Sequence, residues 1–192
     1  MMDFALKIKA KMECLNMNWK PIEINSSKAK IIISILLLYH VTELLIIKAG
    51  VNLNEISFFQ RVLCAVGILI IHEGIHFVIG AILAKDRGKT HIGFIPNKLA
   101  FYMNVDGTYK FYCLILNLLG PFLILTIILG IFLFAFKVYT PLLWIIVFYN
   151  SFMSASDIYN SIFIIKNFSL STNFKLSEFI LYSNDIQKTI NQ

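Results

Sequence analysis

Charged residues are scarce in this chain. They make up 15% of its 192 residues, whereas hydrophobic residues make up 58%. A water-soluble globular domain has about 25% charged residues. The composition therefore excludes an ordinary soluble domain and indicates that the lipid bilayer is the solvent of most of this chain.

Cysteines are also few, and the sequence shows no pattern typical of a cleavable signal peptide. Cys14, Cys64 and Cys113 lie far apart, without the paired spacing of a disulfide framework or of a thiolate metal site. About thirty mostly polar residues precede the first apolar run, and no small-residue cleavage pattern follows it. We therefore expect the first apolar run to be a membrane anchor.

The net charge of +6 does not indicate a nucleic-acid partner, because the basic residues do not gather on one soluble domain. Six lysines lie in residues 1–30, five Lys or Arg in residues 85–110 and three in residues 166–192. Basic residues of membrane proteins concentrate on the cytoplasmic side. This distribution predicts that both termini are cytoplasmic.

Four apolar stretches are each about long enough to cross the hydrocarbon core of a bilayer as a helix. They cover residues 31–47, 62–84, 111–136 and 141–165, and the first is the shortest. Within residues 92–105, apolar runs flank a Pro-Asn-Lys turn, which predicts a hairpin. The predicted fold class is an all-α polytopic membrane protein with about four transmembrane helices and a small membrane-associated β hairpin. Residues 1–30 would form a basic arm, residues 31–165 the membrane domain and residues 166–192 a tail.

The second apolar stretch contains the sequence His72-Glu73-Gly74-Ile75-His76. Residues four apart share one face of a helix, so His72 and His76 can direct their imidazoles at one metal ion. Glu73 is rotated away from that face, where it can take a proton from water instead of binding the metal. Ionisable groups near the middle of an apolar span are expensive unless an ion or a polar cavity compensates them. The pattern therefore favours a zinc site over a purely structural histidine pair.

A catalytic zinc usually has three protein ligands, so two histidines leave it one short. Asp157 is the best candidate for the third, because it is the only acid in the fourth apolar stretch. It also belongs to a polar stripe at helical spacing, formed by Asn150, Ser154, Asp157 and Ser161. The stripe is expected to face the protein interior, either around a metal or in interhelical hydrogen bonds.

Other polar residues leave alternatives open. His40 and Glu43 are three residues apart and compete for the role of third ligand, although they could instead pair with each other or give access to the cavity. His91 follows a charged loop and is expected to be solvated or part of the hairpin. Asn117 could bond a neighbouring helix or a substrate backbone.

These motifs give the chain a resemblance to a family of small integral membrane proteins called putative zincin peptidases, which are related in layout to site-2 intramembrane metalloproteases. The resemblance covers most of residues 62–165. It is carried by the histidine motif, by Gly93-Phe94 with Lys98-Leu99-Ala100-Phe101-Tyr102, by Gly120-Pro121-Phe122 and by Ser156-Asp157. It implies zinc ligation by His72, His76 and Asp157, with Glu73 as general base and acid. By analogy with site-2 proteases, it also implies that the hairpin presents an extended substrate strand.

The chain departs from the stricter site-2 signature around the third ligand. That signature has Asn, Pro and then Asp-Gly, whereas this chain has Asn150 without a nearby proline, and Asp157 followed by Ile158. The Gly-Asp pair of the family also appears here as Ser156-Asp157. These departures concern the local backbone and the substrate more than the metal.

The function expected from the sequence is a zinc-dependent peptidase that hydrolyses a peptide bond of a membrane protein or peptide, in or at a bacterial plasma membrane. Candidate substrate-binding residues are Asn150, Asn117, Phe101 and Tyr102. The alternative is a nonhydrolytic zinc-binding membrane protein with an immunity or regulatory role. Glu73 argues against this alternative, because a structural zinc site needs no adjacent base. A transporter is disfavoured because no inverted repeat is evident.

Overall fold

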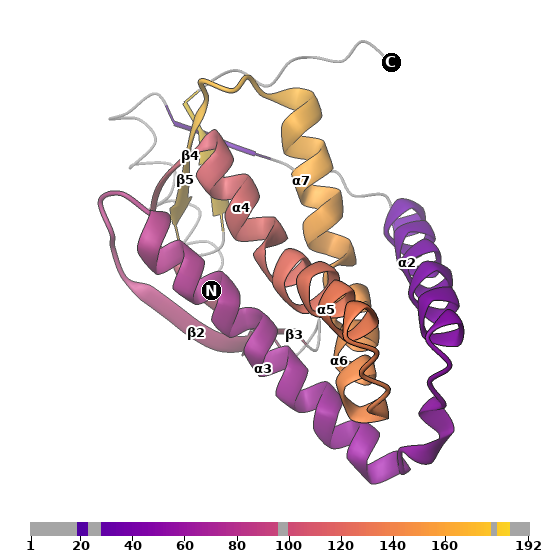
Figure 1. Ribbon diagram of the computed structural model, residues 1–192. Coiled ribbons are helices and arrows are strands. Elements are labelled where there is room, and N and C mark those ends of the chain that lie inside the picture. Colours follow the sequence, from indigo (N-terminus) through magenta and orange to yellow (C-terminus); the bar gives the residue numbers. More distant parts are fainter. Residues whose placement is uncertain (1–18, 23–27, 96–99, 178–179, 185–192) are drawn as a thin grey trace.

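A computed structural model describes residues 19–22, 28–95, 100–177 and 180–184 (Figure 1). Its helices are α2 (Lys28–Lys48), α3 (Phe58–Leu83), α4 (Phe111–Pro121), α5 (Leu129–Ala135), α6 (Pro141–Met153) and α7 (Ala155–Asn167), with a 3-10 turn η1 (Leu53–Glu55) and a π-helical segment η3 (Phe122–Ile128). Its strands are β1 (Lys20–Pro21), β2 (Thr90–Ile95), β3 (Ala100–Val105), β4 (Gly107–Lys110), β5 (Asn173–Ser177) and β6 (Ile180–Ser183). Most of the basic arm lies outside the described residues.

Helix α3 starts four residues before the predicted span because of a capping box. The Ser57 hydroxyl accepts a hydrogen bond from the Gln60 backbone N–H, and the Gln60 side chain accepts one from the Ser57 N–H at 3.0 Å. These bonds satisfy backbone donors that the first turn of a helix leaves free. The result is a 26-residue helix with the histidine motif in its second half.

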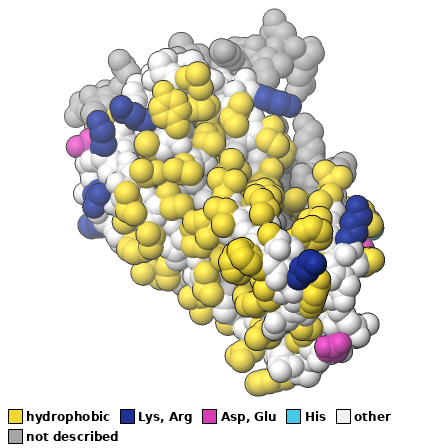
Figure 2. Space-filling model, in the orientation of Figure 1, with side chains coloured by type: hydrophobic (Ala, Val, Ile, Leu, Met, Phe, Trp, Pro, Cys, Tyr) yellow, Lys and Arg dark blue, Asp and Glu magenta, His cyan; other side chains and the backbone are white. Residues whose placement is uncertain are grey.

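Two helical segments are long and apolar enough to cross a membrane: α3, and the run from Phe111 to Ala135 that comprises α4, η3 and α5. The bent pair α6 and α7 makes a third if it is one span. Hydrophobic side chains cover much of the face seen in Figure 2, as expected for a surface that meets lipid. The first predicted span forms the 21-residue helix α2. Its crossing of the membrane, and hence a total of four spans, stays a prediction.

The fourth predicted span differs from the expected single helix. It bends by 46° between α6 and α7. Backbone hydrogen bonding continues across the bend, since Ser154 N–H donates to Asn150 O at 3.0 Å and Ile158 N–H donates to Ser154 O at 2.9 Å. No proline is present to predict this change of direction.

Helices α3 and α4 pack closely where α4 has Gly120. A Cβ atom at Gly120 would collide with the Cδ1 atom of Ile79 on α3. The missing side chain therefore lets the α4 backbone lie against α3, one turn from the histidine motif. The following residue, Pro121, is the last residue of α4 and is followed directly by the π-helical segment η3.

The predicted hairpin is confirmed by the antiparallel pairing of β2 and β3, which runs from Thr90↔Val105 to Ile95↔Ala100. Its predicted turn at residues 96–98 lies outside the described residues. A second sheet, with strand order β1-β6-β5-β4, was not predicted. The expected all-α class with one hairpin is therefore incomplete. These strands have only two to five residues each, too short for a clear alternating pattern.

The second sheet joins three basic segments of the sequence. Strand β1 comes from the arm, β4 from residues 85–110, and β5 and β6 from the tail. The described strands of these segments therefore lie together at one end of the molecule. The sheet packs through Phe174 and Tyr109, which are fully buried. Burial, and then the nearby Asp106 charge, raise the pKa of Tyr109 to about 12, so its hydroxyl stays a neutral donor to Val105 O at 2.9 Å.

Replacement of Gly107 by Ala should destabilise the fold. A Cβ atom there would lie 2.9 Å from the Cβ of Ala84 and 2.9 Å from the carbonyl oxygen of Lys85. The Lys85 carbonyl accepts from Thr108 N–H and cannot move away freely. We expect the free energy of unfolding to fall by about 1–3 kcal/mol, measured as a lower Tm in detergent. Gly67→Ala in α3 is the control, because nothing lies within 4 Å of its new Cβ. Equal Tm values for the two variants would contradict this packing.

Candidate metal centre

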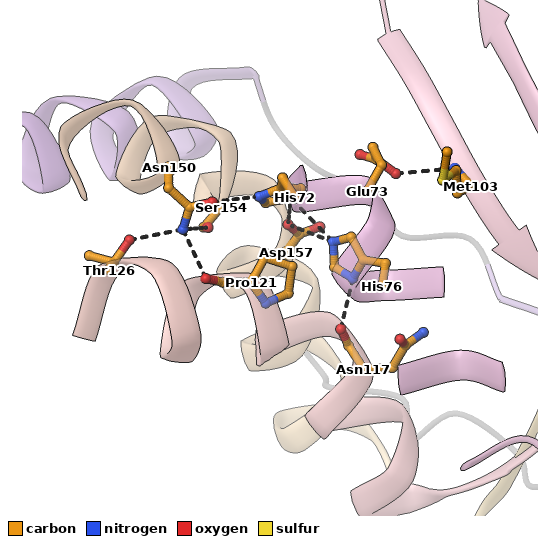
Figure 3. A network of polar contacts seen from close by, with 10 residues as sticks. All are labelled: His72, Glu73, His76, Met103, Asn117, Pro121, Thr126, Asn150, Ser154 and Asp157. Carbon is orange, nitrogen blue, oxygen red and sulfur yellow. Dashed lines mark hydrogen bonds and ion pairs between the residues drawn. The ribbon is translucent and has the colours of Figure 1, made fainter. Parts of the chain in front are cut away.

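The two histidines of α3 direct the same ring nitrogen toward one point. His72 Nε2 and His76 Nε2 are 3.2 Å apart, and the two rings meet at an interplanar angle of 76° (Figure 3). The arrangement follows from their four-residue spacing on one helical face. The His72 side chain is 3% exposed and that of His76 is 13% exposed, so both lie inside the helical bundle.

Asp157 in the first turn of α7 completes the cluster. Its Oδ2 atom lies 3.2 Å from His72 Nε2 and 3.4 Å from His76 Nε2. The bend before α7 lies three residues from Asp157, so it helps to set the direction of this carboxylate. The predicted polar stripe does face inward: Asn150, Ser154 and Ser161 are buried.

Hydrogen bonds at the other ring nitrogen define the tautomer of each histidine. His72 Nδ1 lies 2.8 Å from Asn150 Oδ1, and His76 Nδ1 lies 2.8 Å from the backbone oxygen of Asn117. Amide and carbonyl oxygens only accept hydrogen bonds, so each Nδ1 carries the proton and donates it. In the neutral form of each ring, Nε2 is then the unprotonated nitrogen, and its lone pair is directed toward the Asp157 carboxylate.

This set of donor atoms fits a zinc ion. Zinc binds imidazole nitrogen and carboxylate oxygen at about 2.0–2.2 Å with tetrahedral geometry, which separates its ligand atoms by about 3.3–3.6 Å. The three separations in the cluster are 3.2, 3.2 and 3.4 Å. Two lone pairs and a carboxylate this close repel one another unless a cation lies among them. A third protein ligand also leaves one position for water or substrate, as in catalytic zinc sites.

Glu73 does not belong to the cluster. Its Oε2 accepts a hydrogen bond from the backbone N–H of Met103 in β3 at 3.3 Å, and it points away from Asp157 (Figure 3). Glu73 is half-buried beside His72, next to the cluster but outside it. It is therefore available for proton transfer.

The remaining predicted site residues are distributed as follows. His40 and Glu43 lie on α2, 3.6 Å apart and largely exposed, and are not part of the cluster. His91 lies in β2 and bonds Asp106 at 3.0 Å. Phe101 and Tyr102 lie in β3, and their side chains are outside the described part of the structure.

Both asparagines bond a neighbouring helix, as the sequence allowed, but the sequence did not indicate that the two histidines are their partners. The Asn150 amide is fully buried and bonds His72, and the Asn117 backbone bonds His76. Within the described residues, the Asn117 side-chain oxygen is buried without a hydrogen-bond partner. A proline four residues after Asn117 was the one available signal for its free carbonyl.

Comparison with known proteins gives one family. The family model described as "Putative zincin peptidase" matches residues 65–171, which is more than half of the chain and includes the three residues of the cluster. No curated protein and no solved structure matches the chain. The match, together with a histidine and aspartate cluster that fits zinc, shows that the chain belongs to this family of zincin peptidases.

Proposed function

We propose that the protein is a zinc-dependent peptidase that hydrolyses a peptide bond within or at the membrane. The observation that carries the proposal is the convergence of His72, His76 and Asp157 on one point, with Glu73 beside them. Family membership supports a zinc metallopeptidase. The intramembrane character is supported by the position of the cluster on an apolar helix.

The depth of the site is estimated from α3. His72 lies about 21 Å from the start of α3 and about 17 Å from its end, at 1.5 Å per residue. A helix that crosses the membrane would place it near the middle of the hydrocarbon core, which is about 30 Å thick. Because a substrate helix keeps its carbonyls in internal hydrogen bonds, a substrate segment must unwind before its peptide bond can reach the metal.

In the proposed hydrolysis, the zinc ion and the side chain of Glu73 have different roles. A zinc ion held by this donor set supplies Lewis acidity, which polarises a carbonyl group and makes water more acidic. The Glu73 carboxylate accepts a proton from the attacking water and then donates it to the leaving nitrogen. The water oxygen bonds to the carbonyl carbon, the carbon–nitrogen bond breaks, and the products are a carboxylic acid and an amine.

The hairpin is proposed to hold the unwound substrate. The Met103 N–H donates to Glu73 of α3, and Met103 lies opposite Ile92 of β2 in the hairpin. Among the described residues, β3 has no strand on its other side. An extended substrate could add to this edge and lie beside Glu73.

We further propose that the end of the molecule bearing the second sheet faces the cytoplasm. The sheet joins the arm, residues 85–110 and the tail, which carry most of the Lys and Arg residues. Such residues are retained on the cytoplasmic side.

The replacement Glu73→Gln should abolish cleavage without removing zinc. The amide cannot accept the proton, so we expect the rate to fall by about 100-fold or more, while zinc stays near one ion per chain. The measurement is zinc content by elemental analysis, together with cleavage of a panel of transmembrane peptides in liposomes. Glu55→Gln, in the exposed turn η1, is the control and should leave both unchanged. Zinc binding without any cleavage by the unaltered protein would favour the nonhydrolytic alternative.

The replacement Asp157→Ala should weaken zinc binding, because it removes the only carboxylate of the cluster. We expect the Kd for zinc to rise by more than about 100-fold, measured by competition with a chromophoric chelator. Asp106→Ala serves as the control, since Asp106 lies near the hairpin and bonds His91 instead of the cluster. Zinc affinity unchanged in Asp157→Ala would rule out Asp157 as a ligand.

A further inference from the structure

Each imidazole of the cluster is oriented through its Nδ1 atom by an oxygen from another helix. His72 Nδ1 donates to the Asn150 side chain of α6, and His76 Nδ1 donates to the Asn117 backbone of α4, both at 2.8 Å. Partners of this kind fix the tautomer and the ring direction of a metal-binding histidine. Both partners in turn depend on one residue, Pro121 at the end of α4.

Pro121 frees the oxygen that His76 uses. In an α-helix, the N–H of residue 121 would donate to the carbonyl of residue 117, but proline has no N–H. The next N–H, that of Phe122, donates to the Leu119 oxygen instead. The Asn117 oxygen is therefore free within its own helix, and the His76 Nδ1–H satisfies it. The close packing at Gly120 brings this part of α4 against α3.

Pro121 also orients the amide that His72 uses. The Pro121 carbonyl accepts from Asn150 Nδ2 at 2.9 Å, and the Thr126 hydroxyl oxygen lies 2.9 Å from the same nitrogen. Because a backbone carbonyl can only accept, it must face the NH₂ group of the amide. The oxygen of that amide then faces His72. Figure 3 shows the Asn150 side chain between Pro121 and His72.

We propose that Pro121 is a positioning residue for both histidine ligands. Its missing N–H releases the Asn117 oxygen for His76, and its carbonyl holds Asn150 in the orientation that His72 requires. Both imidazoles are thereby kept as Nδ1–H tautomers with their Nε2 lone pairs directed at the metal. Pro121 is itself fully buried and contributes no atom to the ligand cluster. The inference rests on the proposed zinc site.

The test compares zinc affinity with thermal stability in purified full-length protein. Pro121→Ala restores an N–H that competes with His76 for the Asn117 oxygen. We expect the Kd for zinc to rise by about 10–100-fold. The Tm of the zinc-free protein should stay the same or rise, because proline is the poorest helix former. If the role of Pro121 were merely structural, its replacement would lower the zinc affinity and the Tm together. Pro141→Ala is the control, because a proline at the first position of a helix replaces no hydrogen bond.

A second pair of variants tests the part of the proposal that concerns Asn150. This pair still tests the proposal if Pro121→Ala does not fold. Asn150→Ala removes the acceptor of His72 and should raise the Kd for zinc by about 10–100-fold. Asn150→Asp keeps an acceptor for the Nδ1–H and should recover affinity relative to Asn150→Ala. Ser151→Ala is the neighbouring buried control, since Ser151 bonds Val147 and Thr42.

The outcomes separate this inference from the proposed function. Unaltered zinc affinity in Pro121→Ala and Asn150→Ala, with zinc bound by the unaltered protein, overturns the role of Pro121 and leaves the zinc site intact. Equal weakening by Asn150→Asp and Asn150→Ala overturns the orienting hydrogen bond to His72. If the unaltered protein binds no zinc after reconstitution, the proposed zinc site is overturned and this inference falls with it.

Discussion

The repulsion among three electron-rich atoms is the constraint on which the site depends. Two imidazole Nε2 atoms and a carboxylate oxygen lie 3.2–3.4 Å from one another inside an apolar bundle. Such an arrangement is stable only with a cation among the atoms, because little water is present to screen them. The hydrogen bonds at Nδ1 of His72 and His76 oppose a shift of the proton to Nε2 in either neutral ring.

The helices turn polar side chains toward the metal centre and hydrophobic side chains toward the exterior. The face of α6 and α7 that carries Asn150, Ser154 and Ser161 is turned inward, while many large hydrophobic side chains of α3 and α5 are exposed. Lipid accepts the exposed side chains at little cost, whereas each buried polar group needs a hydrogen-bond partner. The second sheet closes one end of the molecule by tying the arm and the tail to the segment between α3 and α4.

The departures from the site-2 signature acquire a physical meaning in this fold. No proline follows Asn150, and the change of direction before Asp157 comes from a bend at Ser154 that keeps its backbone hydrogen bonds. The proline next to the site is Pro121, on a different helix, where it faces Asn150 through its carbonyl. A proline near the third ligand is thus not needed to place Asp157 beside the histidines.

The sequence by itself determined the local chemistry. The four-residue spacing of His72 and His76 places both on one helical face whatever the rest of the chain does, and the spacing of the polar stripe identified the inward face that bears Asp157. The hairpin followed from its apolar runs and turn residues. What only the tertiary structure decided was the bend between α6 and α7, the second sheet and the role of Pro121. Each of these depends on contacts between residues far apart in the chain, such as β4 with β5 or Asn117 with His76, and local periodicity carries no information about such contacts.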